Sequence, residues 1–323
     1  MGGPGGRGPP SRHDSTGVRE RDHGRPGRAG SANGHTWPMT LISVDTLAAA
    51  LAAGDDTVRV ADVRWYLGQP ERGRDEYRAG HIPGADFIDL DRDLAAPSGP
   101  GRHPLPDPTA FAERLAALGF GSEHLIVAYD DAGGTIAARL WWMLDDLGHR
   151  RTAVLDGGLQ AWREAGHPLS TAEPTHPRAT LRLAPTWSRT VDRDALRGRL
   201  GSATVLDARA GERYRGEVEP VDPAAGHIPT ALSAPANANL GPDGRFLPAA
   251  ALRDRFAGLG IAGDADDVVT SCGSGVTACH NALAMRLAGL PDPLLYAGSF
   301  SDWSRCGEPV ATGADPGTWL RED

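Results

Sequence analysis

Two kinds of apolar pattern alternate along the chain from residue 41 onward. Short apolar runs bounded by turn residues predict buried strands, and longer stretches with apolar residues three or four apart predict helices. In the first half, the predicted strands cover 57–64, 125–129 and 152–155, and the predicted helices cover 46–53, 109–118 and 135–147. Because strands and helices alternate, we expect an α/β fold with a mainly parallel sheet.

The motifs of the first half return in the second half. Matching motifs lie about 145 residues apart, which is too long for a solenoid repeat and suits two tandem domains. We therefore interpret the chain as an internal duplication. The matching pairs are Val60–Arg64 (VADVR) with Val205–Arg209 (VLDAR), Gly80–Ala85 (GHIPGA) with Gly226–Ala231 (GHIPTA), and Gly157–Trp162 (GGLQAW) with Gly298–Trp303 (GSFSDW).

The second half contains a cysteine at the start of a glycine-rich loop, Cys272–Thr277 (CGSGVT). A short buried strand is predicted to end just before this loop, and a mostly buried helix is predicted over 277–288. Glycines let successive backbone N–H groups turn inward, which makes an anion-binding nest above the helix N-terminus. A thiolate is stabilised in such a place by the amides and the helix dipole. An isolated cysteine is more often a packing residue, but this loop favours a nucleophile at Cys272.

Two classes of enzyme place a cysteine in a loop of this kind. Cysteine phosphatases need an arginine six positions after the cysteine to hold phosphate oxygens, and that position here is Ala278. The loop instead resembles the active loop of the rhodanese superfamily, in particular its 3-mercaptopyruvate sulfurtransferase version. Thiosulfate-specific rhodaneses resemble it too, but they carry Arg-Lys where this chain has Gly273 and Ser274.

Two-domain sulfurtransferases of this superfamily are also built by tandem duplication, so the resemblance spans about residues 39 to 315. It implies two rhodanese-like domains, each a mainly parallel sheet flanked by helices. We expect a non-catalytic domain at 39–170, a linker rich in Pro and Thr at 171–188, a catalytic domain at 189–315 and a C-terminal tail at 316–323. Residues 1–38 are mainly Gly, Pro, Arg and Ser, and this composition predicts a disordered extension.

The first copy serves as a control for the second. When the two copies are aligned, Asp130 stands opposite Cys272. A carboxylate is no nucleophile for sulfur and repels an anionic substrate, so the first copy is predicted to be non-catalytic. His81 and His227 occur in the matching turns of both copies, which favours a structural role for them.

The resemblance implies further site residues. In enzymes of this family, the resemblance implies, an Asp, a His and the loop serine form a hydrogen-bonded relay near the substrate. In this chain these positions fall on Asp91, His103 and Ser274. The active loop closes around a sulfur atom bonded to the cysteine. The loop residues expected to surround that sulfur are Gly273, Gly275, Val276 and Thr277.

A cation for the substrate carboxylate is also implied by the resemblance. It falls on Arg213, and Arg215 is a close rival because an unaligned helix could present either side chain. A second substrate arginine in the mercaptopyruvate enzymes lies nine residues beyond the first. Here that register gives Asp222, a departure from the family pattern.

Composition limits the remaining possibilities. A net charge of −9 argues against a nucleic-acid partner, which would need a basic face. No unbroken apolar run approaches about eighteen residues, so we expect neither a membrane partner nor a membrane-bound protein. Three cysteines at unrelated spacings form neither a disulfide framework nor a zinc motif, and they fit a reducing cytoplasm. We expect no metal and no cofactor.

Together these observations predict a cytoplasmic sulfurtransferase. It would move a sulfane sulfur from 3-mercaptopyruvate, through a persulfide on Cys272, to a thiol or to cyanide. The thiol acceptor would be a thioredoxin-like protein or a small thiol. Two alternatives remain open: a thiosulfate:cyanide sulfurtransferase, and a non-catalytic module that carries a persulfide.

Overall fold

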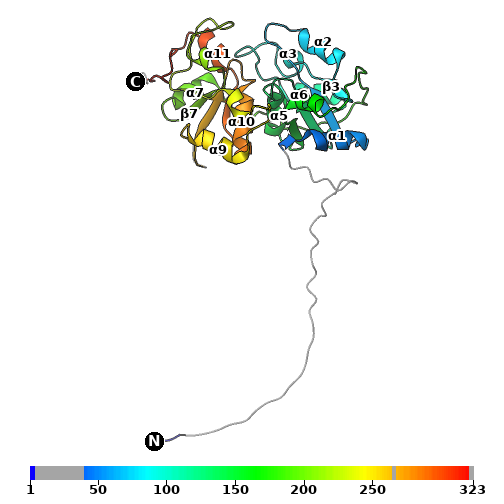
Figure 1. Cartoon of the computed structure of the whole chain (residues 1–323). Coiled ribbons are helices and arrows are strands. Elements are labelled where there is room, and N and C mark those ends of the chain that lie inside the picture. The colour runs from blue at the N-terminus through cyan, green and yellow to red at the C-terminus, as the bar shows by residue number, and fades with distance from the viewer. Residues whose placement is uncertain (4–39, 264–266, 320–323) are drawn as a thin grey trace. The chain divides into compact units, whose positions relative to one another are not determined.

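A computed structural model describes residues 1–3, 40–263 and 267–319. All helices and strands given below lie within one compact unit, residues 37–323 (Figure 1). Apart from residues 1–3, the extension predicted at 1–38 lies outside the described residues. No helix among the residues described has the length and the apolar character needed to cross a membrane.

The described strands form two five-stranded sheets, and every strand pair in them is parallel. The sheets have equivalent strand orders, β1-β5-β4-β2-β3 and β6-β10-β9-β7-β8, as expected for a duplication. This confirms the predicted α/β class with two tandem domains. The strands are β1 (Leu41–Ile42), β2 (Val58–Asp62), β3 (Ala85–Phe87), β4 (Leu125–Tyr129), β5 (Thr152–Leu155), β6 (Thr190–Val191), β7 (Thr204–Asp207), β8 (Leu232–Ser233), β9 (Val268–Ser271) and β10 (Leu294–Tyr296).

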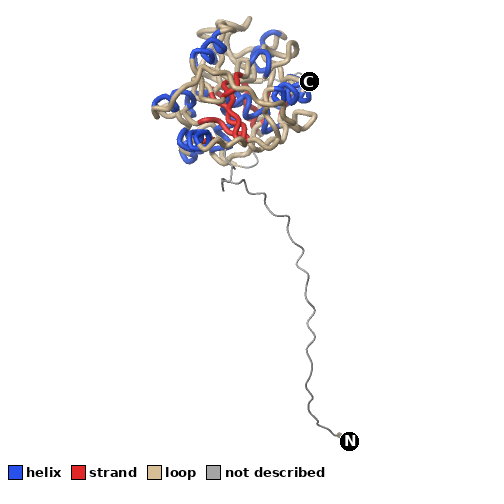
Figure 2. Tube along the Cα trace, turned by 90° about the vertical axis from the view of Figure 1, so that its right-hand side faces the viewer, coloured by secondary structure: helices blue, strands red, loops and turns tan. Residues whose placement is uncertain are grey.

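Helices surround these strands, which lie inside the molecule (Figure 2). In the first domain the helices are α1 (Val44–Ala52), α2 (Arg72–Ala79), α3 (Leu90–Asp93), α4 (Pro108–Ala117), α5 (Ala137–Asp146) and α6 (Gly158–Glu164). In the second they are α7 (Arg193–Arg199), α8 (Gly211–Tyr214), the 3₁₀ helix η1 (Ala236–Asn239), α9 (Ala249–Ala257), α10 (Ala278–Leu287) and α11 (Ser299–Arg305).

Most of the predicted elements occur with small shifts at their ends. The predicted strands 125–129 and 152–155 have the predicted bounds, and the helices predicted at 46–53, 109–118, 135–147 and 277–288 end within two residues of prediction. Caps explain two of the helix starts: Ser43 accepts the N–H of Thr46 at 3.2 Å, and Asp107 accepts the N–H of Ala110 at 2.9 Å. The sequence analysis assigned no helix to α2, which is rich in Arg and buries only Gly73 and Tyr77.

One of the apolar clusters contains residues of both domains and crosses their interface. Helices α5 and α10 face each other there (Figure 1), and all residues of α5 are buried. Completely buried side chains of both helices, such as Leu140 and Leu283, belong to the same cluster, and burying each one contributes about 1.5–3 kcal/mol. At the end of α5, Asp145 pairs with Arg286 and Arg189 of the second half, both at 2.7 Å. The interface therefore holds residues from the two copies in fixed register.

The predicted linker at 171–188 contains no helix or strand and lies against the first domain. Its Ala179 N–H donates to the Ala116 carbonyl at 2.9 Å. Near its end, Trp187 stacks on Trp142 of α5, with ring centres 5.9 Å apart. The segment is thus packed along the domain that precedes it.

Candidate active site

The cysteine loop (Cys272–Thr277) follows β9 directly and leads into α10. Its first residues are held by the start of α11. The Phe300 N–H donates to the Cys272 carbonyl at 3.0 Å, and the Ser301 N–H donates to the Gly273 carbonyl at 2.9 Å. The Cys272 N–H donates to the hydroxyl of Ser299 at 3.1 Å. Cys272 is only 2% exposed, so its thiol sits in a fixed and largely enclosed position.

Gly275 gives the loop its turn. Its φ is +76°, and a Cβ added there would overlap the carbonyl oxygen of Ala297. Farther along the loop, the amides of Ser274, Val276 and Ala278 have no hydrogen-bond acceptor among the residues that the structure describes. These amides therefore have no competing acceptor in this part of the structure, as the predicted nest requires.

The first domain contributes a chain of hydrogen bonds that ends on the cysteine loop. The carboxylate of Asp91 accepts from His103 Nε2 at 3.0 Å. His103 Nδ1 makes the next hydrogen bond of the chain, to the Ser274 hydroxyl at 2.8 Å. Trp65 Nε1 donates to the other oxygen of Asp91 at 2.9 Å. The bond from His103 lowers the pKa of Asp91, which keeps this carboxylate ionised. The three residues named for a relay therefore lie in direct contact.

A buried arginine that the sequence analysis did not identify ties the two loops together. The guanidinium of Arg139 donates to the carbonyls of Gly275 and His103, each at 3.0 Å, and to the carbonyl of Leu94 at 3.3 Å. Its side chain is completely buried, as is most of α5 around it. The available signal was one charged residue within the apolar run AARLWWML, since such a residue needs buried partners.

Two other arginines approach Gly273 from different domains. A Cβ on Gly273 would lie 3.5 Å from Nη1 of Arg213 and 2.8 Å from Nη2 of Arg102. The Arg102 N–H donates to the hydroxyl of Ser301 at 3.0 Å, which fixes this residue beside the loop. The sequence analysis missed Arg102, although it directly precedes His103, because only the fold brings its side chain to the loop. Arg215, the rival of Arg213, is partly exposed and pairs with Glu217 at 2.7 Å.

The structure also describes the remaining predicted loop residues and the two other cysteines. Val276 is buried, and Thr277 precedes α10. None of the three cysteines is paired. Burial raises the pKa of Cys279 to about 12, so this thiol stays protonated, and it contacts the Gly275 carbonyl. Cys306 is exposed, next to Arg193.

The matching histidines of the two copies have equivalent contacts. His81 and His227 are completely buried, and each ring stacks on a tyrosine. Each Nδ1 is 2.8 Å from the carbonyl of that same tyrosine, Tyr77 or Tyr214. These contacts agree with the structural role predicted for both histidines.

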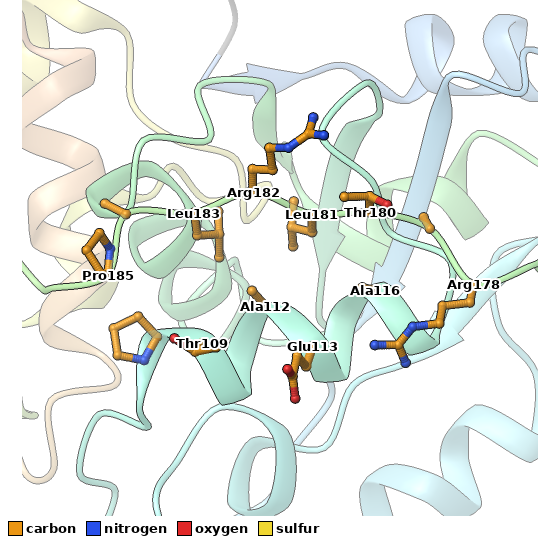
Figure 3. Close-up of a pocket in the computed structure, with 13 residues that line it drawn as sticks. Thr109, Ala112, Glu113, Ala116, Arg178, Thr180, Leu181, Arg182, Leu183 and Pro185 are labelled. Carbon is orange, nitrogen blue, oxygen red and sulfur yellow. The ribbon is translucent and has the colours of Figure 1, made fainter.

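A pocket of about 410 Å³ lies elsewhere, between α4 and the segment 178–185 (Figure 3). Its lining includes Ala112 and Glu113 of α4 and Arg182 of the linker. No residue of the cysteine loop or of the Asp91 chain lines it. The cysteine loop and the Asp91 chain therefore lie outside this pocket.

Comparisons with known proteins agree with this architecture. The family model described as "Rhodanese-like domain" matches residues 43–165 and 192–306. A protein of Pseudomonas aeruginosa named "Probable 3-mercaptopyruvate sulfurtransferase" is 48% identical over 280 residues, which cover 84% of this chain and 98% of that protein. The thiosulfate sulfurtransferase of Bos taurus is 34% identical over 299 residues, which cover 87% of this chain and 95% of that protein.

Solved structures give the same result. The 3-mercaptopyruvate sulfurtransferase from Leishmania major superposes with a TM-score of 0.73 at 30% identity, covering 83% of this chain and 75% of that one. The chain therefore belongs to the tandem rhodanese-like sulfurtransferases. It is a sulfurtransferase enzyme, as the sequence analysis predicted.

Proposed function

We propose that the enzyme takes its sulfur from 3-mercaptopyruvate and carries it as a persulfide on Cys272. The observation that carries this proposal is the hydrogen-bonded chain from Asp91 through His103 to Ser274, which ends on the loop of the nucleophile. A donor with a keto group can use such a chain, because the hydroxyl reaches the oxygen on which charge develops. The identity to the relative from P. aeruginosa, whose name carries the same activity, supports the choice.

In this proposal, the donor carboxylate lies between two cations. Arg213 from the second domain and Arg102 from the first both direct a nitrogen at Gly273. A carboxylate bound there has charge-assisted hydrogen bonds from both sides of the domain interface. With the carboxylate fixed in that place, the keto oxygen comes within reach of Ser274 and the donor sulfur comes within reach of Cys272.

The first half-reaction then follows from the placed groups. The Cys272 thiolate attacks the donor sulfur, a new S–S bond forms, and the C–S bond breaks. The electron pair of that bond passes to the former keto group as an enolate, which the Ser274 hydroxyl stabilises. The proton lost by the donor thiol then reaches the enolate carbon, which gives pyruvate and leaves the outer sulfur anionic. The amides of the nest (Ser274, Val276 and Ala278) stabilise the anionic outer sulfur of the persulfide.

The second half-reaction returns the thiolate. An acceptor thiolate, or cyanide, attacks the outer sulfur of the persulfide and leaves with it, which makes the cycle a ping-pong reaction. A thioredoxin-like protein or a small thiol is the proposed physiological acceptor. We place the enzyme in the cytoplasm, where unpaired cysteines such as Cys306 are kept reduced.

Thiosulfate is the second candidate donor. Arg102 supplies a cation near the loop that the loop sequence itself lacks, and this contact favours binding of a small anion. The bovine relative is named for that activity. The loop sequence argues against thiosulfate as the donor. Gly273 and Ser274 are uncharged, whereas the resemblance gives the thiosulfate-specific rhodaneses Arg and Lys at these two positions.

Steady-state rates with the two donors, measured side by side, test the proposal. We expect kcat/KM to be higher for 3-mercaptopyruvate by about two orders of magnitude. The reason is that the loop of this chain lacks two cations that would bind dianionic thiosulfate. Mass spectrometry after donor treatment should locate one added sulfur on the peptide that contains Cys272. A preference for thiosulfate would contradict the donor assignment and leave the sulfurtransferase activity untouched.

A further inference from the structure

Asp222 lies nine residues after Arg213, where the family resemblance places a second substrate arginine. Its side chain has no exposed surface. Its carboxylate lies between the two arginines that reach the cysteine loop. One oxygen accepts from Nη1 of Arg102, and the other accepts from Nη2 of Arg213 at 3.4 Å. Burial raises the pKa of Asp222, and the charges of Arg102 and Arg213 oppose this effect.

Each guanidinium divides its nitrogens between Asp222 and the loop. Arg102 uses Nη1 for Asp222 and points Nη2 at Gly273, while Arg213 uses Nη2 for carboxylates and points Nη1 at Gly273. Among the described residues, no acceptor binds the buried Nε atom of either arginine. Both arginines therefore keep free donors for an anion at the loop.

Carboxylates balance the two positive charges. Glu219 accepts from Arg213 at 2.7 and 3.0 Å, and its Oε1 also accepts the N–H groups of Val221 and Asp222, each at 3.0 Å. The nearby Arg209 pairs with Asp207 at 2.6 Å and with Glu219 at 3.4 Å. Three guanidinium groups thus meet three carboxylates, and the formal charges of these six side chains cancel.

We propose that Asp222 is a specificity-determining residue that makes this cluster prefer a monoanionic donor over a dianionic one. The inference rests on the proposed function and identifies the side chain that sets its donor choice. A single carboxylate on the donor uses the free guanidinium nitrogens. A second negative charge meets the fixed carboxylate of Asp222 at close range and low solvent exposure, where repulsion is poorly screened. Asp222 thereby rejects dianions while it holds Arg102 in place.

The test is Asp222→Asn, which keeps the shape and an acceptor for Arg102 but removes the charge. We expect kcat/KM for thiosulfate to rise about tenfold and kcat/KM for 3-mercaptopyruvate to change by less than about threefold. Glu217→Gln is the matched control, because it removes an exposed carboxylate that pairs with Arg215 away from the loop. Its ratio of the two kcat/KM values should equal that of the unmodified enzyme.

A second variant gives the opposite shift. Arg102→Met removes a cation and leaves Asp222 with less compensation, so the thiosulfate-to-mercaptopyruvate ratio should fall about tenfold. If Asp222→Asn lowers kcat/KM for both donors equally, Asp222 only positions Arg102 and the inference is overturned. A change of the ratio in Glu217→Gln as large as that in Asp222→Asn would overturn it as well.

Binding measurements separate this inference from the proposed function. If the unmodified enzyme turns over neither donor, the proposed function fails. Calorimetry on Cys272→Ser protein, with and without Asp222→Asn, then compares sulfate, a dianion, with pyruvate, a monoanion. We expect the added change to tighten sulfate binding about tenfold and to leave pyruvate binding within about threefold. Equal effects on both anions would overturn the role of Asp222.

Discussion

The loop after β4 in the first domain and the loop after β9 in the second occupy equivalent places, each between a central strand and the helix at the domain interface. In the first loop, the completely buried carboxylate of Asp130 accepts four backbone N–H groups at 2.8–2.9 Å. These donors are Ala132, Gly134, Ile136 and Ala137. The nest of the first domain is therefore filled by its own side chain.

In the second loop, Cys272 replaces that carboxylate. The amides of Ser274, Val276 and Ala278 correspond to three of the four donors that bind Asp130, and within the described part of the chain nothing accepts from them. Within the described residues, the second loop thus lacks the side-chain acceptor that fills the first. The comparison shows that the duplicated fold places equivalent amides in both domains, and we propose that the residue at their centre decides their use.

The largest expected effect comes from removing the nucleophile. Cys272→Ser should lower turnover by at least about three orders of magnitude, because no other group can hold the sulfur. Its melting temperature should stay within about 2 °C of the unmodified enzyme, since the loop contacts are made by the backbone and Ser299. Cys279→Ala is the control, because that thiol stays protonated. Turnover in Cys272→Ser above a few per cent would refute this assignment of the nucleophile.

The reverse effect is expected in the first loop. Asp130→Ala leaves four N–H groups without their acceptor, three of them in buried hydrogen bonds, and we expect a loss of about 3–5 kcal/mol of unfolding free energy. Turnover per folded molecule should change less than about twofold, because Asp130 takes no part in the chemistry. Urea unfolding followed by tryptophan fluorescence measures the first quantity, and rates at low temperature measure the second.

The neighbouring Asp131 provides the control for that experiment. It accepts from the hydroxyl of Tyr66 near the surface, so Asp131→Ala should cost less than about 1 kcal/mol. If Asp130→Ala were no more destabilising than Asp131→Ala, the filled-nest interpretation would be wrong.

The third prediction concerns the hydrogen-bonded chain of Asp91, His103 and Ser274, which ends on the second loop. Ser274→Ala and His103→Asn should lower kcat for 3-mercaptopyruvate by about 30–100-fold, because its leaving group is an enolate that needs stabilisation and a proton. The same variants should change kcat for thiosulfate by less than about threefold, since sulfite leaves without a proton. His167→Asn, a change at a histidine that packs on Trp162, should alter neither rate. Equal losses with both donors would assign Ser274 and His103 a structural role only.

The same contrast explains how far the sequence could predict the molecule. The alternating pattern and the repeats were sufficient for the two parallel sheets, because each rests on local spacing. The chain of Asp91, His103 and Ser274 came from a family resemblance alone, since its members lie far apart in sequence. Arg102 and Arg139 were missed for a physical reason. They act from the first domain on a loop of the second, and no local pattern shows which loop across an interface a side chain contacts. The apolar run around Arg139 indicates only that its charge needs buried partners.

The smallest expected effect concerns the residue beneath each loop. Gly158 and Ser299 are equivalent and both have positive φ, 56° and 53°. A Cβ on Gly158 would overlap the Asp130 carbonyl, whereas Ser299 keeps its side chain and accepts the Cys272 N–H at 3.1 Å. A left-handed serine costs about 1 kcal/mol, so the hydroxyl compensates for backbone strain while it positions the cysteine.

Ser299→Gly removes the strain and the acceptor together. We expect the unfolding free energy to change by less than about 1 kcal/mol, since the two effects offset each other. The kcat/KM values for both donors should fall about three- to tenfold, because Cys272 is less well positioned. Ser299→Ala keeps the strain and loses the acceptor. It should therefore be less stable than Ser299→Gly by about 1–2 kcal/mol, with a similar loss of rate. If Ser299→Gly matched the unmodified enzyme in rate, the hydroxyl would serve only the backbone, and the difference between Gly158 and Ser299 would have no bearing on the reaction.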